Sequence, residues 1–253
     1  MSLFLAKLTL TPLIMYLTSA AGRRWGPGIS GWLTGLPLLA GPVSVFVCIE
    51  QGPDFARQAA GSTLVGMWSS CAFCLAYHAV ANRGWVAAAV AAVVAFAVAT
   101  ALLNAVSLPP LAGLLGVVGL ASLCLKWIAA PVSTVAMTRP PRWDMPARLA
   151  IAAGYVIVQT GVAGWLGPQL SGLVTPFPIV VIVLTAFAHH QLGEAAATRV
   201  LRGFLIGMYA FATFFWLVAV GMEPLGPWLA YPVALAACLA INGLALWGLR
   251  RRL

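Results

Sequence analysis

Long apolar runs are the feature that most limits what this chain can fold into. The stretch from Val86 to Leu103 carries no charged residue, and stretches of similar character recur along all 253 residues. A helix that spans a bilayer needs about 20 such residues, because lipid offers no partner to an unbonded backbone group. Continuous runs also favour helices over the alternating segments of a membrane β-barrel. The sequence therefore predicts an all-α, polytopic transmembrane helix bundle.

The composition supports this prediction and excludes several other classes of protein. Apolar residues make up 62% of the chain and charged residues only 8%, whereas soluble domains carry about 25% charged residues. A soluble enzyme, a secreted disulfide scaffold and a disordered chain are thereby excluded. The chain is predicted to have about nine spans, roughly at 2–21, 29–50, 56–80, 85–106, 109–130, 147–166, 170–190, 197–220 and 226–249.

The basic residues predict how the chain is oriented in the membrane. Of its 14 Lys and Arg residues, all but Lys7 and Arg57 lie on one side of a nine-span arrangement. Because basic residues concentrate in cytoplasmic loops, we expect a periplasmic N-terminus and a cytoplasmic C-terminus. The net charge of +9 then reports orientation and indicates no nucleic-acid partner. Arg23 and Arg24 follow the first apolar run, which argues against a cleaved signal peptide there.

An internal repeat relates the two halves of the chain. A shift of 141 positions places Gly26–Pro37 on Gly167–Pro178, with Gly, Pro and Ser at matching positions. Matching helices are five apart in order, an odd number, so they should cross the membrane in opposite directions. The prediction is a 4+1+4 inverted-topology repeat: a four-helix repeat at 1–106, a connector helix and cytoplasmic loop at 107–146, and a second four-helix repeat at 147–253. Many secondary transporters have this architecture, although a duplication kept only for packing would leave the same pattern.

Short motifs in each half also carry a family resemblance. Lys7 and Arg148 are basic residues early in the first helix of each half, and Gly66–Ser69 contains Met-Trp-Ser. Together with Leu170–Pro178, these features resemble the GlpM family of small bacterial inner-membrane proteins. The resemblance covers both halves and leaves the connector unmatched. It implies a duplicated module in a bacterial inner membrane with a link to envelope polysaccharide production, and it implies no named reaction.

Prolines interrupt two of the matching helices. Pro37 and Pro42 are expected to interrupt the helix at 29–50, and Pro176 and Pro178 the one at 170–190. Proline removes a helical hydrogen bond, so the freed carbonyl must lie against protein or a cavity. Broken helices at corresponding places point to a transporter site, although the prolines could also serve only to kink the helices. The predicted substrate-binding residues, expected to meet near a pseudo-two-fold axis, are Ser30, Gly31, Thr34, Pro37, Ser171, Gly172, Thr175 and Pro178.

The spacing of the cysteine and histidine residues does not indicate a complete metal site. Cys71, Cys74 and His78 share one helical face, which is conducive to soft-metal binding, but no fourth ligand is visible. His189 and His190 have Glu194 at helical spacing, at a membrane edge. We therefore predict no metal ion.

The charged residues near the predicted span ends are expected to contact lipid or the membrane interface. The loop Met137–Ala147 is expected to be the only sizeable soluble segment and to contact anionic lipid through its basic residues, with Asp144 among them. Lys7 and Arg148 are expected to snorkel to the interface, and the alternative is that they hold lipid or an anionic substrate. No Asp or Glu lies centrally in a predicted span, which lowers the expectation of a carboxylate-coupled pump.

These features together predict a transporter-like inner-membrane protein. It would move a small solute or a lipid-linked molecule through a site between the two repeats. The alternative is a non-transporting accessory or scaffold protein that supports envelope polysaccharide synthesis, and a membrane-embedded enzyme that acts on lipid ranks third. No nucleophile–base pair, phosphate loop or HExxH motif is present, so neither enzymatic activity nor a cofactor is expected. The expected partners are membrane lipids and an unidentified small solute. The sequence does not decide whether the protein also forms a homodimer.

Overall fold

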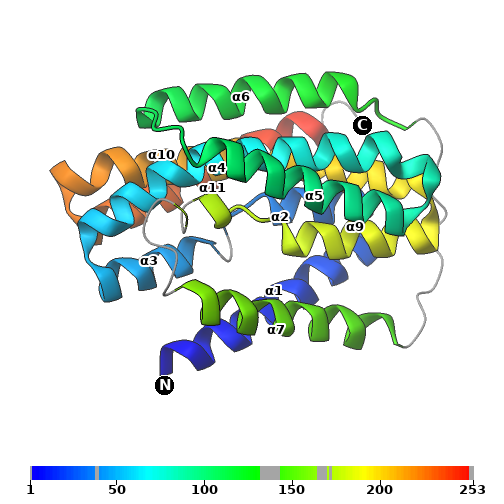
Figure 1. The fold of residues 1–253 in the computed structure, drawn as a ribbon, viewed down its shortest axis with the longest axis horizontal. Coiled ribbons are helices and arrows are strands. Elements are labelled where there is room, and N and C mark those ends of the chain that lie inside the picture. The colour runs from blue at the N-terminus through cyan, green and yellow to red at the C-terminus, as the bar shows by residue number, and fades with distance from the viewer. Residues whose placement is uncertain (1, 38–39, 132–142, 164–169, 171–172, 251–253) are drawn as a thin grey trace.

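The chain folds into a helical bundle, as its apolar runs predict. The computed structural model describes residues 2–37, 40–131, 143–163, 170 and 173–250. Within these residues the regular secondary structure is helical and contains no strand (Figure 1). The helices are α1 (Ser2–Trp25), α2 (Pro27–Thr34), α3 (Ala40–Gln51), α4 (Pro53–Val80), the 3₁₀ turn η1 (Ala81–Arg83), α5 (Trp85–Leu103), α6 (Pro110–Trp127), α7 (Asp144–Ala163), α9 (Ile179–Leu192), α10 (Glu194–Leu225) and α11 (Pro227–Arg250).

The two longest helices, α4 and α10, form the centre of the bundle. They contact each other, and both also contact α6, which runs along one side of the bundle, while α1 and α7 pair on the opposite side (Figure 1). In both central helices 61% of the most apolar window is buried inside the protein, against 22% in α5 and α6. The core is therefore built on α4 and α10, and α5 and α6 leave most of their apolar surface for lipid.

Two glycines form the corners at which the chain enters the central helices. Gly52 (φ 92°) separates α3 from α4, and Gly193 (φ 85°) separates α9 from α10. Such positive φ angles are easily reached only by glycine. Pro53 follows Gly52 directly, at the first position of α4. A proline is tolerated there because the first N–H groups of a helix have no acceptor within the helix.

The helix predicted at 29–50 is two helices, α2 and α3, with a break at Pro37. This position is the one that the proline argument predicted. The prediction that Pro42 also interrupts the helix is wrong, because Pro42 lies within the first turn of α3. A proline there removes no helical hydrogen bond, since the first N–H groups of a helix have no partner within it.

Helix α6 is held to both central helices by hydrogen bonds. Trp68 of α4 donates from Nε1 to Gly113 O (3.3 Å), and the Tyr209 hydroxyl of α10 forms a hydrogen bond with Ser122 Oγ (2.8 Å). Arg202 of α10 also donates from Nη1 to Leu125 O of α6 (2.8 Å). Polar contacts therefore fix α6 to α4 and to α10.

Within the described part of the chain, four helices are long and apolar enough to cross a membrane. They are α4 together with η1, α5, α6 and α10, and shorter apolar helices occur at α3, α9 and Pro227–Gly243. Tryptophans that are exposed near helix ends occur at positions 25, 85, 127, 143 and 228, as is typical of side chains at a membrane–water interface.

Candidate functional site

The first broken helix holds four of the predicted site residues. In α2, Ser30 Oγ donates a hydrogen bond to Pro27 O (2.8 Å), and Thr34 Oγ1 donates one to Gly31 O (2.6 Å). Ser30, Gly31 and Pro37 are buried, and Thr34 is half-buried. Both hydroxyls therefore bond to carbonyls of their own helix, a common arrangement for Ser and Thr.

The backbone of α2 lies in direct contact with the backbone of α10. A Cβ atom on Gly31 would overlap Val200 O, and a Cβ atom on Gly203 would overlap Gly28 O. Small residues allow this close approach between membrane helices. Gly31 is thus required for packing, whatever else it does.

The second break lies at residues 173–178 and packs against α4. Ser70 Oγ of α4 donates a hydrogen bond to Pro176 O (2.9 Å). A Cβ atom on Gly66 of α4 would lie 2.5 Å from Leu173 O, closer than real Cβ contacts occur. The carbonyl at this proline is therefore bonded to protein, as the membrane environment requires.

The remaining predicted site residues belong to this second segment. Thr175 is half-buried and Pro178 is buried directly before α9, whereas Ser171 and Gly172 lie outside the described residues. Because α2 also contacts α9, the two broken helices meet. Each break packs on the long helix of the other half, the first on α10 and the second on α4. The role of these residues in substrate binding stays a prediction.

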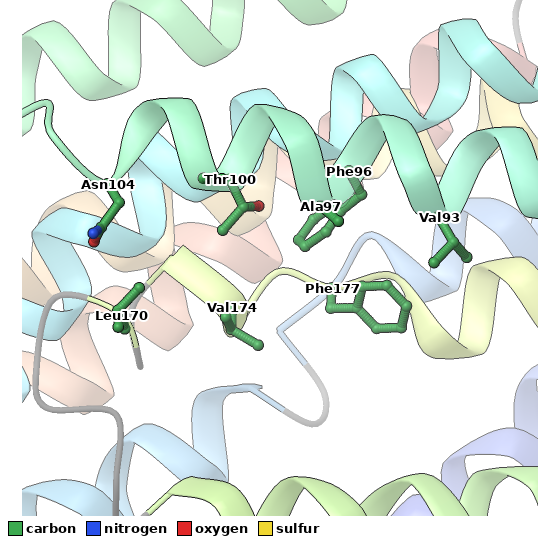
Figure 2. A pocket seen from close by; sticks show the side chains of 9 residues that line it. Val93, Phe96, Ala97, Thr100, Asn104, Leu170, Val174 and Phe177 are labelled. Atoms are coloured by element: carbon green, nitrogen blue, oxygen red, sulfur yellow. The ribbon is translucent and has the colours of Figure 1, made fainter.

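A cavity of about 540 Å³ lies beside the second break (Figure 2). One wall is α5, with Val93, Ala97 and Thr100, and the other wall includes Val174 and Phe177. Among the lining residues that the structure describes, Thr100 and Asn104 are the polar ones. The sequence analysis did not find these α5 residues, because a run of Ala and Val with no motif looks the same whether it faces a cavity or lipid.

A buried ionic network joins α1, α7 and α9 at one end of the bundle. Arg23 Nη2 lies 2.8 Å from Asp144 Oδ2, and Arg148 donates to both oxygens of Asp144 at 3.1 Å. Gln191 Nε2 donates to Asp144 Oδ1 (2.5 Å). The Arg148 guanidinium also lies 4.5 Å from the centre of the Phe187 ring. Three side chains, those of Arg23, Arg148 and Gln191, thus bond to one carboxylate whose side chain is 0% exposed.

This network corrects two expectations about charged residues. Asp144 was expected in a soluble loop, but it is the first residue of α7 and is fully buried. Arg148 was expected to snorkel, but it is buried against Asp144. The spacing of Asp144 and Arg148, four residues apart at the start of a helix, is a signal that could have predicted their pairing.

The five cysteines are buried, whereas His78 and His189 are half-buried and His190 is exposed. Cys71 and Cys74 are buried in α4, and Cys124 Sγ lies 4.0 Å from Cys71 O. Elsewhere the Tyr77 hydroxyl lies 3.3 Å from His189 Nδ1. Among the residues that the structure describes, no group of three or more His, Cys, Asp or Glu side chains could hold a metal ion.

The fold and these sites define a membrane-embedded, all-α protein with two interrupted helices. In comparisons with known proteins, no family model, no curated protein and no solved structure matches the chain. The resemblance to the GlpM family therefore stays a prediction that rests on the sequence motifs.

Proposed function

We propose that the protein is a transporter-like protein of a bacterial inner membrane that moves a small solute or a lipid-linked molecule between two inverted four-helix repeats. Its two broken helices would form the pathway. The observation that carries this proposal is that each broken helix packs, through a glycine backbone contact, on the long central helix of the other half. Broken helices that meet between repeats are typical of secondary transporters.

The helix boundaries support the repeat. The offset of 141 positions that relates Gly26–Pro37 to Gly167–Pro178 also relates the corner glycines, Gly52 and Gly193. It relates the glycine contacts as well: a Cβ atom on Gly207 would lie 2.6 Å from Trp32 O, and the corresponding pair is Gly66 and Leu173. Two helix–helix contacts with the same offset are difficult to attribute to chance matches between apolar sequences.

The packing of matching helices supports their inverted orientation. The end of α1 meets the start of α7 through Arg23 and Asp144, so these two helices are antiparallel. The end of α4 meets the end of α9 through Tyr77 and His189, and α10 begins directly after α9. Since α4 and α10 therefore also run in opposite directions, an axis in the membrane plane would relate the two halves.

The lengths of the half-helices support nine spans. At about 1.5 Å per residue, α2 and α3 are about 12 and 18 Å long, and together they match the roughly 30 Å of a bilayer's hydrocarbon core. Counting each broken helix as one crossing therefore gives the nine alternating spans of the sequence prediction. The end that carries Arg23 and Arg148 would face the cytoplasm.

Accessibility of the two breaks tests the proposed pathway. In a variant with cysteine at Thr34 or at Thr175, the introduced thiol is expected to react with a water-soluble thiol reagent in vesicles, because both positions would line an aqueous pathway. The five native cysteines are buried and should contribute little labelling. The matched control is Val94→Cys on the exposed face of α5, which should stay unreactive because it faces lipid.

Flux into proteoliposomes provides the second measurement. A panel of radiolabelled metabolites and lipid precursors should contain at least one compound that enters faster than in protein-free vesicles and that protects the cysteines at positions 34 and 175 from labelling. If the cysteines introduced at positions 34 and 175 did not react and no compound entered the vesicles, transport would be contradicted. The accessory or scaffold function would then be the better account.

A further inference from the structure

We propose that the cavity beside the second break binds one acyl chain of a bilayer phospholipid. Its two walls are α5 and the residues Leu170, Val174 and Phe177 (Figure 2). This inference rests on the membrane embedding of α5, and it holds whether or not the protein transports anything.

The cavity opens toward the bilayer because of where α5 lies. Only 22% of the most apolar window of α5 is buried inside the protein. Val90, Val94 and Val98 are each more than half exposed on this helix, and Ala97, which lines the cavity, lies next to Val98. Among the described residues, the face of α5 beside the cavity is apolar, so hydrocarbon chains of the bilayer would reach the cavity there.

The polarity of the lining fits the body of an acyl chain. Phe96 and Phe177 meet edge to face with ring centres 5.0 Å apart, and both line the cavity. The hydroxyl of Thr100 donates to Ser69 Oγ (3.0 Å), so its hydrogen is already used within the protein. Since none of the described lining residues is charged, the cavity offers no partner to a free carboxylate.

The polar end of the cavity fits the direction in which a phospholipid lies. Asn104 follows the last residue of α5, while Val93 lies three turns deeper, about 16 Å away along the helix. The chain would enter beside Asn104, where α5 ends, and would extend toward Val93 and Phe177 (Figure 2). The headgroup would stay outside the cavity at the membrane interface.

The small side chain at position 97 contributes to the room in the cavity. A larger side chain at this position would extend into the space between α5 and the residues Val174 and Phe177.

Photo-crosslinking in lipid vesicles tests this proposal. The full-length protein is reconstituted with phosphatidylethanolamine that carries a diazirine at the end of one acyl chain, and labelled residues are identified by mass spectrometry. Labelling is expected on Val174 and Phe177, which are half-buried. In Ala97→Trp this labelling should fall by about tenfold, as expected when roughly two methylene groups lose their burial.

The control is Val98→Trp, which places the same ring on the neighbouring exposed position and should leave the labelling unchanged. Ala97→Leu adds a smaller side chain at the same position and gives a milder second variant. Absence of labelling at positions 174 and 177, or an equal loss in the Trp variants at 97 and 98, would overturn the proposal. A free diazirine fatty acid that labels these positions in place of the phospholipid would also overturn it. Labelling without any solute flux would support the lipid site and contradict transport alone.

Discussion

Replacing Asp144 with asparagine is expected to lower the free energy of unfolding by about 3–5 kcal/mol. The carboxylate is fully buried and accepts hydrogen bonds from Arg148 and Gln191. Without its charge, the buried guanidinium of Arg148 would be left uncompensated in a medium of low polarity. The measurement is reversible unfolding of the purified protein in mixed micelles, followed by circular dichroism as the fraction of denaturing detergent is raised.

Two further variants separate the buried charge from a general effect of mutation. Arg23 contacts the same carboxylate, but its side chain is 41% exposed, so Arg23→Gln should change stability by only about 1 kcal/mol or less. The double variant Asp144→Asn with Arg148→Met should recover much of the loss, because no buried charge then remains. Equal losses in Arg23→Gln and Asp144→Asn would show that burial of the charge is not the cause.

Replacing Gly31 with alanine is expected to destabilise the protein by about 3 kcal/mol or more, at the upper end of the effects of overpacking. The new Cβ atom would overlap the carbonyl oxygen of Val200, and neither backbone can move without shifting a whole helix. The intrinsic helix propensity of alanine would favour the variant by up to about 1 kcal/mol, so the loss must come from packing. Unfolding in mixed micelles measures it.

A neighbouring glycine of α2 provides the matched control. A Cβ atom on Gly28 would lie 3.8 Å from Arg199 O, an ordinary contact, so Gly28→Ala should be neutral or slightly stabilising. In α4, Gly66→Ala should behave like Gly31→Ala, whereas Gly61→Ala, which meets no atom within 4 Å, should not. If the alanine variants at positions 28 and 31 proved equally stable, the close backbone crossing would be disproved.

The break positions could be predicted from the sequence, but the partners of the broken helices could not. Pro37 and Pro178 stand at breaks because proline removes a local hydrogen bond, and this effect depends only on neighbouring residues. The close contacts of Gly31 with Val200 and of Gly66 with Leu173 join residues more than 100 positions apart. A glycine pattern indicates that some close contact exists, and it does not indicate with which helix.

For the charged residues too, one property could be predicted from the sequence and another could not. The positive charges near helix ends are visible in the sequence, and their asymmetry predicts an orientation. The burial of Asp144 depends on Arg23, which is 121 positions away, and on Gln191, which is 47 positions away. An acidic residue between prolines and arginines looks like part of a soluble loop until those partners surround it.

The sequence by itself determined that the chain is helical, that it is suited to a membrane, and where two helices break. These properties follow from apolar runs and from backbone bonds that close within a few residues. Only the tertiary structure decided that the broken helices pack on α10 and α4, that Asp144 is buried, and that α5 borders a cavity of about 540 Å³. Each of these features depends on contacts between residues that are far apart in the sequence. Such residues come into contact only in the packed bundle, so neighbouring residues alone do not predict them.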